Sequence, residues 1–266
     1  MAAVPRWQAK WLLALAFPLS AGAEPRTINI VGCEPAAYAQ KVREKAYHWR
    51  ERFERFWCRG TERTALYPIE VHCGKGAGAL PHLTTYRLIL NEVIETARID
   101  IDPSVSGILD HGLAHGMGHA VLPSCLAPHV PLMTLPAWIL EGMAHSLVAT
   151  LDEDARREFG RVGAPPLEGL TNFLFDGRRD LGFYTQAALL VRFLVDNGGG
   201  ADRFRRFVAE LGFEGVSASQ NTAQLGQYGR MLRKHYGMTL TEVETAFRAA
   251  VARLLAPEPR RTAGDR

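Results

Sequence analysis

Hydrophobic residues recur with the period of an α-helix between residues 36 and 57. The apolar positions are spaced four, four, three, four and three residues apart, at Tyr38, Val42, Ala46, Trp49, Phe53 and Phe56. Positions that recur in this way form one stripe along a helix, and the lysines, arginines and glutamates between them fall on the other side. The pattern therefore predicts a long amphipathic helix over 36–57.

Shorter stretches on both sides of this helix alternate between apolar and polar residues. A strand is expected over 27–31 and another over 67–73, and residues 84–90 and 93–101 are expected to form a hairpin around Asn91-Glu92. A strand–helix–strand unit places its two strands parallel, whereas a hairpin is antiparallel. The N-terminal part is therefore expected to form a small mixed β-sheet.

The rest of the chain is dominated by helical periodicity. Helices are expected over 137–151, 183–197, 201–211, 220–236 and 239–255. The prolines of 123–136 and the glycines and prolines of 152–181 predict connections without regular structure. The expected fold class is α+β, in which residues 24–255 form one domain with a small mixed sheet, a long helix and a helical C-terminal half.

Three histidines follow one another at intervals of four residues, at His111, His115 and His119, after several N-cap residues over 102–106. Residues four apart lie on one face of a helix, and two imidazoles at that spacing can hold one metal ion. The segment is also rich in glycine, and each glycine inside a helix costs about 1 kcal/mol relative to alanine. Close packing or a bound metal must therefore stabilise this helix.

A carboxylate follows in an apolar helical stretch, Leu135-Pro-Ala-Trp138-Ile-Leu-Glu141-Gly-Met-Ala. A buried glutamate needs a partner, which a metal held by the histidines would supply. Two histidines and a downstream glutamate are the ligand set of one class of catalytic zinc sites. The sequence therefore predicts that Glu141 completes a zinc site.

The general base of such a site is missing. In H-E-x-x-H helices, the glutamate after the first histidine takes a proton from the metal-bound water. That position is Gly116 if the pair is His115 and His119, and Gly112 if the pair is His111 and His115. Either choice leaves metal binding intact and removes the group that activates water.

The N-terminus has the three parts of a secretory signal. Arg6 and Lys10 precede an apolar run over 11–19, and Ala21-Gly-Ala23 forms a cleavage site. The run is too short to span a membrane. We expect a signal peptide over 1–23, cleavage after Ala23, and a secreted or periplasmic protein.

The charge of the chain is close to balanced. There are 31 lysines and arginines against 28 acidic residues, and cleavage removes two of the basic residues, so the mature chain has 29 against 28. A net charge this small gives no reason to expect nucleic-acid binding. The arginine-rich end, 256–266, is expected to be a disordered basic tail.

Four cysteines lie after the cleavage site, and an even number in an exported protein predicts two disulfides. A helix of about 22 residues is about 33 Å long, whereas bridged Cα atoms lie within about 7 Å. A continuous helix therefore excludes Cys33–Cys58 and, with it, Cys73–Cys125. Parallel strands favour Cys33–Cys73 with Cys58–Cys125, and an antiparallel arrangement would give Cys33–Cys125 with Cys58–Cys73.

The motif His-x-x-x-His followed by Leu-Pro-x-Trp-x-x-Glu-Gly-Met-Ala resembles the peptidase MA-like proteins of the gluzincin clan of zinc metallopeptidases. The resemblance continues in Phe183-Tyr184-Thr-Gln-Ala-Ala-Leu-Leu-Val-Arg-Phe-Leu and in Tyr236-Gly-Met-Thr-Leu-Thr-Glu-Val-Glu, and it covers roughly residues 66–252. It implies a zincin-type metal helix in the α+β fold.

Residue roles follow from the resemblance by position. It implies that Zn²⁺ is bound by His115, His119 and Glu141, with His111 as the alternative ligand if the frame differs by one turn. Tyr184 is a candidate donor to a developing oxyanion, with packing at the start of a helix as the alternative. The chain departs from the family pattern at Gly116 and at Ala187, where a serine is common.

His145 lies one helical turn after Glu141 and is a candidate to contact and orient one of the metal ligands.

Three functions follow from these residues. The favoured one is a pseudo-peptidase that binds metal and a peptide or protein ligand but has impaired or lost hydrolysis. The others are an active peptidase with a surrogate base, from Asp110, His111, His145 or a glutamate elsewhere, and a structural exported protein without metal. If Gly116 is the only defect, Gly116→Glu should create or raise hydrolysis.

Overall fold

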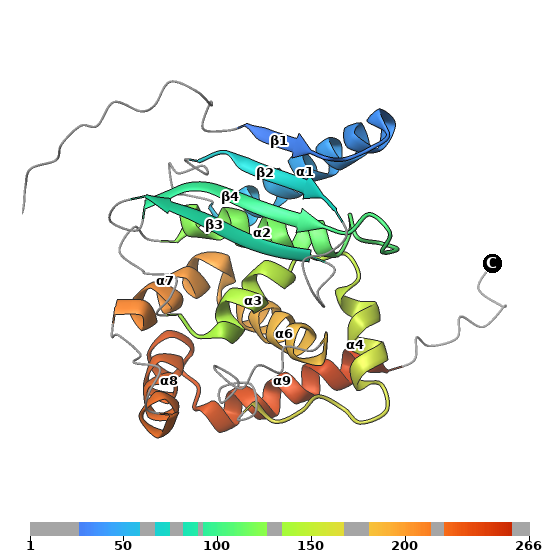
Figure 1. The fold of residues 1–266 in the computed structure, drawn as a ribbon. Coiled ribbons are helices and arrows are strands. Elements are labelled where there is room, and N and C mark those ends of the chain that lie inside the picture. Colours follow the sequence, from blue (N-terminus) through green and yellow to red (C-terminus); the bar gives the residue numbers. More distant parts are fainter. Residues whose placement is uncertain are drawn as a thin grey trace, which may run out of the picture.

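The structure is a computed structural model, and it describes residues 27–58, 67–74, 82–89, 93–126, 135–167, 181–213 and 221–256. The signal peptide expected over 1–23 lies outside these residues, as does all but the first residue of the expected basic tail. Over the described residues the fold is α+β, with a small mixed sheet on the N-terminal side and a mainly helical remainder, which confirms the predicted class (Figure 1).

The sheet has the strand order β1-β2-β4-β3. β1 (Ile28–Val31) and β2 (Ile69–Cys73) are parallel, β2 and β4 (Val93–Ile101) are parallel, and β3 (His82–Ile89) pairs antiparallel with β4. Alternate residues of β4 are fully buried, namely Ala97, Ile99 and Ile101. One face of the sheet is therefore covered by the rest of the protein, as its alternating pattern predicts.

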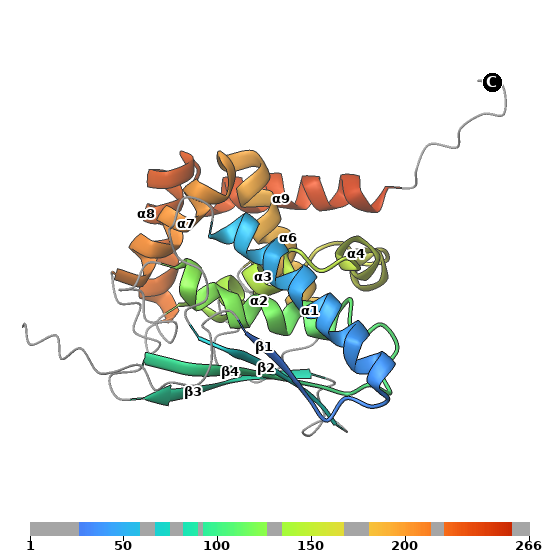
Figure 2. The ribbon, with the colours of Figure 1, turned by 90° about the horizontal axis from the view of Figure 1, so that it is seen from above.

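Two helices cover that face, α1 (Ala36–Trp57) and α2 (Gly112–Cys125), and Figure 2 shows both on the same side of the sheet. The bounds of α1 are those that the sequence predicts, although Trp57 rather than Phe56 completes its buried stripe. The indole nitrogen of Trp49 donates a hydrogen bond of 2.9 Å to the carbonyl of Leu109, which ties α1 to the turn before α2.

The helical half consists of α3 (Ala137–His145), α4 (Leu151–Phe159), α6 (Leu181–Gly198), α7 (Gly200–Phe213), α8 (Asn221–Tyr236) and α9 (Leu240–Leu255). These helices lie on the side of α2 away from the sheet (Figure 1). Thr239 and Glu242 form a capping box at the start of α9, in which each side chain accepts from the backbone of the other residue. α2 is therefore enclosed between the sheet and the helical half.

Four details of the secondary structure predicted from the sequence are wrong: the ends of two helices, one helix that was not predicted, and the N-caps over 102–106. α2 continues through Pro123 to Cys125, because a proline in the last turn removes one hydrogen bond of a helix that ends two residues later. The helix predicted over 137–151 ends at His145. A separate helix, α4, lies in the predicted loop. The N-caps over 102–106 are not used, because Asp102 accepts from the backbone of Ser104 and α2 begins at residue 112.

Both disulfides are those that the parallel-strand argument favours. Cys33 is bonded to Cys73, and Cys58 is bonded to Cys125. The first joins the ends of the parallel strands β1 and β2, and the second joins the end of α1 to the end of α2. The second disulfide therefore holds the C-terminal end of α2, the helix that carries His115 and His119, against α1.

None of the helices in the described ranges is long and apolar enough to cross a membrane.

Close packing explains the glycines of α2. A Cβ atom at residue 118 would lie 2.7 Å from the Cα atom and 2.7 Å from the carbonyl oxygen of Ala144, and a Cβ at residue 116 would lie 2.7 Å from a methyl carbon of Ile99. α3 therefore approaches one side of α2, and β4 approaches another, more closely than any residue with a side chain allows.

We expect Gly118→Ala to lower the free energy of unfolding by about 1–3 kcal/mol, because a methyl group at this position overlaps the backbone of α3. Gly229 provides the matched control, since it lies in α8 and a Cβ there meets nothing within 4 Å. Gly229→Ala should raise the free energy of unfolding by up to about 1 kcal/mol. Urea denaturation of both variants measures the difference, and equal effects would contradict the close approach of α2 and α3.

Candidate metal centre

Three side chains from α2 and α3 bring one donor atom each to a single point. His119 Nε2 lies 3.0 Å from His115 Nε2 and 2.9 Å from Glu141 Oε2, and His115 Nε2 lies 3.2 Å from the same oxygen. Tetrahedral ligands at about 2.0–2.1 Å from one zinc ion are about 3.3–3.4 Å apart. The three residues therefore form a group that could hold a metal ion.

Matching intervals along two helices produce this convergence. His115 and His119 are one turn apart on α2, and Glu141 and His145 are one turn apart on α3. The contacts run in opposite order along the two helices, since His119 meets Glu141 and His115 meets His145. Side chains four residues apart share a face of a helix, so the close approach at Gly118 aligns both pairs.

His145 and Tyr184 surround the ring of His115. His145 Nδ1 lies 3.2 Å from His115 Nδ1, which is the ring nitrogen that faces away from Glu141. The ring of Tyr184, at the start of α6, packs edge-on against His115 at 5.4 Å between centroids. The structure therefore places both predicted accessory residues next to a predicted ligand. His145 stands where a group that orients a metal-bound imidazole is found.

Electrostatics favour the protonation states that metal ligands need. Burial lowers the pKa of His115 to about 4, so its ring is neutral near pH 7. Burial alone would raise the pKa of Glu141, but the neighbouring His119 and His115 outweigh it and hold that pKa below its usual value, so the carboxylate is ionised. Metal binding requires a neutral imidazole and an ionised carboxylate.

Access to the group is through His119. All but two of the 14 residues of α2 are buried, and the exceptions are His119 and Pro123. The side chain of His119 is 19% exposed, against 5% for His115 and 9% for Glu141. Solvent or a ligand therefore reaches the three donor atoms from the side of His119.

The position of the missing acid is filled by the sheet. A Cβ at residue 116 would meet Ile99 Cγ2 at 2.7 Å and Thr84 Oγ1 at 3.0 Å, and Ile99 is fully buried. The Thr84 hydroxyl also donates to the carbonyl of Gly116 at 3.4 Å. Gly116 is therefore not simply a glutamate position that has lost its side chain, because no glutamate fits there unless the side chain of Ile99 shifts.

The structure separates His111 from the three donors. His111 precedes α2, and its Nε2 lies 3.7 Å from Asp154 Oδ2 on α4. The pair that meets Glu141 is therefore His115 and His119, as the favoured frame predicts. The sequence does not indicate Asp154 as a site residue, because it lies in the stretch predicted to be a loop, although Leu151, Ala155 and Phe159 have helical spacing.

The proposed surrogate bases lie elsewhere. The carboxylate of Asp110 accepts a hydrogen bond of 2.6 Å from Lys45. His145 is on the Nδ1 side of His115, and the ring of His111 packs against His145 at 5.1 Å between centroids. Both histidines are thus behind the ring of His115 as seen from its Nε2 atom. Neither of them can take a proton directly from water at the Nε2 side.

Comparisons with known proteins identify no relative. No model of a known protein family matches the chain, and no curated protein matches it. The assignment to the gluzincin clan therefore remains a prediction from the motif residues.

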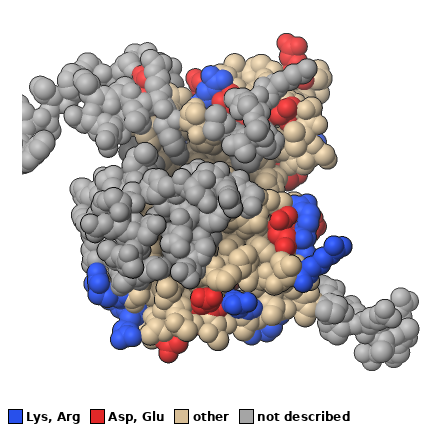
Figure 3. Space-filling view, turned by 60° about the horizontal axis from the view of Figure 1, so that its bottom comes forward, with Lys and Arg blue, Asp and Glu red and all other residues tan. Residues whose placement is uncertain are grey.

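On the face drawn in Figure 3, basic and acidic side chains of the described residues lie next to one another rather than in fields of one sign.

A buried, neutral His115 makes the stability of the metal-free protein depend on pH. Its pKa is about 4 in the folded chain and 6.5 without burial. Between these values the unfolded chain binds the extra proton, so the free energy of unfolding falls by up to about 1.4 kcal/mol per pH unit as the pH is lowered. Denaturation of chelator-treated protein between pH 7 and 4 measures this slope.

The control for this experiment is a histidine on the surface. His115→Gln should remove that part of the slope, whereas His48→Gln should retain it, because His48 is exposed on α1. Equal slopes in the wild type and in both variants would show that the ring of His115 is not held neutral in the fold.

Proposed function

We propose that this protein is an exported, gluzincin-like metal-binding protein that holds one Zn²⁺ with His115, His119 and Glu141 and binds a peptide or protein without hydrolysing it. The observation that carries the proposal is the convergence of Nε2, Nε2 and Oε2 to within 2.9–3.2 Å, next to a residue 116 where even a Cβ would lie 2.7 Å from Ile99 Cγ2.

The chemistry of the donors supports zinc. Two imidazoles and one carboxylate are a common zinc ligand set, and three protein ligands leave a position open to water or to a ligand. The metal would act as a Lewis acid toward a carbonyl oxygen at that position. His119 borders the open side, and Tyr184 packs on His115 and carries a hydroxyl of the kind that donates to a bound carbonyl.

The edge of the sheet supports an extended peptide as the ligand. β3 is the last strand of the sheet and pairs with β4 alone among the described strands. Its Thr84 contacts the backbone of Gly116 in α2, so this edge lies beside the turn that carries His115. An edge strand offers backbone donors and acceptors to an extended peptide.

Metal content is the first test. Protein purified without a His tag should retain one Zn²⁺ per chain after dialysis, measured by elemental analysis. Glu141→Gln and His119→Gln should each lose it, because removal of a direct ligand costs more than the roughly 10–100-fold loss caused by changes behind the ligands. His48→Gln is the matched control and should retain the ion. A wild-type protein without tightly bound metal would overturn the proposal in favour of a structural role.

Hydrolysis is the second test. A fluorescent casein substrate should be cleaved no faster by the zinc-loaded protein than by chelator-treated protein. Gly116→Glu should not create activity, although a general base usually contributes about 10²- to 10⁴-fold, because its side chain collides with Ile99 and the fold is destabilised instead. Hydrolysis by the wild type that is lost both with chelator and in His119→Gln would establish an active peptidase with a base from another part of the chain.

A further inference from the structure

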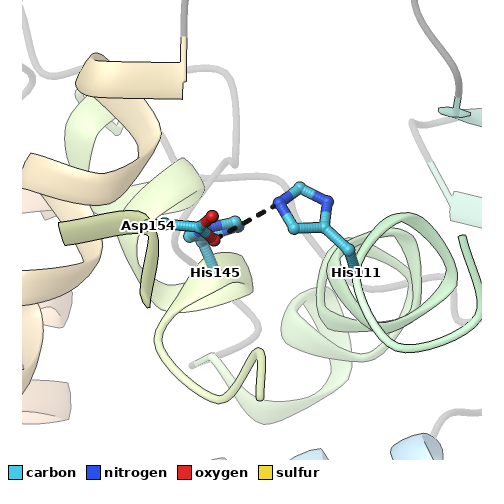
Figure 4. A group of neighbouring side chains, drawn as sticks. All are labelled: His111, His145 and Asp154. Carbon is cyan, nitrogen blue, oxygen red and sulfur yellow. Dashed lines mark ion pairs between the residues drawn. The ribbon is translucent and has the colours of Figure 1, made fainter. Parts of the chain in front are cut away.

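A second group of metal-ligating side chains lies behind the first. His111, His145 and Asp154 each offer a ligand atom, and these atoms all lie within 4.8 Å of one another. Figure 4 shows the three side chains pointing toward a common space, with His111 on one side and His145 and Asp154 on the other. They come from three elements: the turn before α2, the end of α3, and α4.

The distance between His111 and Asp154 suits a shared ion better than a direct bond. His111 Nε2 and Asp154 Oδ2 are 3.7 Å apart, which is longer than a hydrogen bond. Two ligands at about 2.0–2.1 Å from one ion are 3.7 Å apart when they subtend about 130° at it. An ion between the two atoms would therefore bind both without bringing them closer.

The surroundings hold these side chains in place. Asp154 is 3% exposed, and it accepts hydrogen bonds from the hydroxyl of Thr150 at 2.8 Å and from Arg157 at 2.5 Å. His145 is 1% exposed. The buried Asp154 and His145, which are held by their neighbours, lose little freedom when they bind an ion.

We propose that His111, His145 and Asp154 form a second site for a divalent transition metal of the zinc type, beside the site formed by His115, His119 and Glu141. Two imidazoles and a carboxylate suit zinc, iron, copper and nickel rather than magnesium or calcium, which prefer oxygen ligands alone. The inference goes beyond the proposed function, because the two sites share no ligand and each can exist without the other.

The second site is the weaker one. Its His111 Nε2 and Asp154 Oδ2 atoms are 3.7 Å apart, whereas the three donor atoms of the first site lie within 3.2 Å of one another, so the second group is less compact. His145 also contacts His115 through Nδ1 atoms that are 3.2 Å apart, and one hydrogen lies between them. A metal on His115 Nε2 leaves that hydrogen on His115, so a neutral His145 binds a second ion through Nδ1 only by giving up this hydrogen bond, which weakens binding of the second ion further.

Titration of the chelator-stripped full chain with Zn²⁺ alone tests the proposal by calorimetry, and Co²⁺ absorption reports the ligands. The wild type should bind two ions, one tightly and one more weakly. His111→Gln should bind only the tight ion, with the second weakened by more than about 100-fold. Asp154→Asn should do the same, and it provides a second variant because the amide has nearly the same shape as the carboxylate. His48→Gln should bind both ions.

The two proposals fail in different ways. A wild type that binds one ion, lost in His119→Gln and unchanged in His111→Gln, would overturn the second site and leave the proposed function standing. One ion that is lost in His111→Gln and unchanged in His119→Gln would support the second site and overturn the zinc site of the proposed function. Binding of two ions with wild-type affinity by a folded His111→Gln variant, verified by circular dichroism, would also overturn the second site.

Discussion

The close approach of α2 to its neighbours is the constraint on which the rest of the structure depends. Two glycines make it possible, since Gly116 lets β4 reach one side of the helix and Gly118 lets α3 reach another. The cost of glycine in a helix, about 1 kcal/mol at each position, is offset by the burial that close packing allows. Because α3 is held at this distance, Glu141 and His145 meet the histidines of α2 without long side chains or flexible loops.

The charged and titratable groups lie in a row, and the close approach of α2 and α3 sets the first two of its three pairs. His119 with Glu141, His115 with His145, and His111 with Asp154 follow one another at intervals of about one helical turn. α3 is in turn held against α6, because a Cβ at Gly142 would lie 2.6 Å from the carbonyl oxygen of Ala187. This contact gives Ala187 a structural context, since it belongs to a close helix–helix crossing rather than to the row of histidines.

The sequence predicts most of the elements and the first group of three donors, because both depend on local periodicity. The long helix α1 and the mixed sheet follow from spacing. The reach of a helix excludes one disulfide pairing, and the parallel arrangement of β1 and β2 decides between the other two. The sequence does not predict α4, because the glycines and prolines of 152–181 indicate a loop, although the acidic residues of its first turn favour a helix. The methyl group of Ile99 that fills the space beside Gly116 comes from a strand that is distant in sequence, and no local pattern reveals such a contact.

The absent acid and the filled space beside it are separate facts, and the second has the wider consequence. Loss of a glutamate alone would leave a gap that water could enter, and another group could then act as the base from there. Here Ile99 and Thr84 close that side of α2, so any group that activates a bound water must approach from the side of His119. The described residues place Asp110, His111 and His145 away from that side. This is the geometry behind the proposed binding function: a ligand that reaches the three donors through His119 would become hydrolysable only with a base brought in with the ligand or from the rest of the chain.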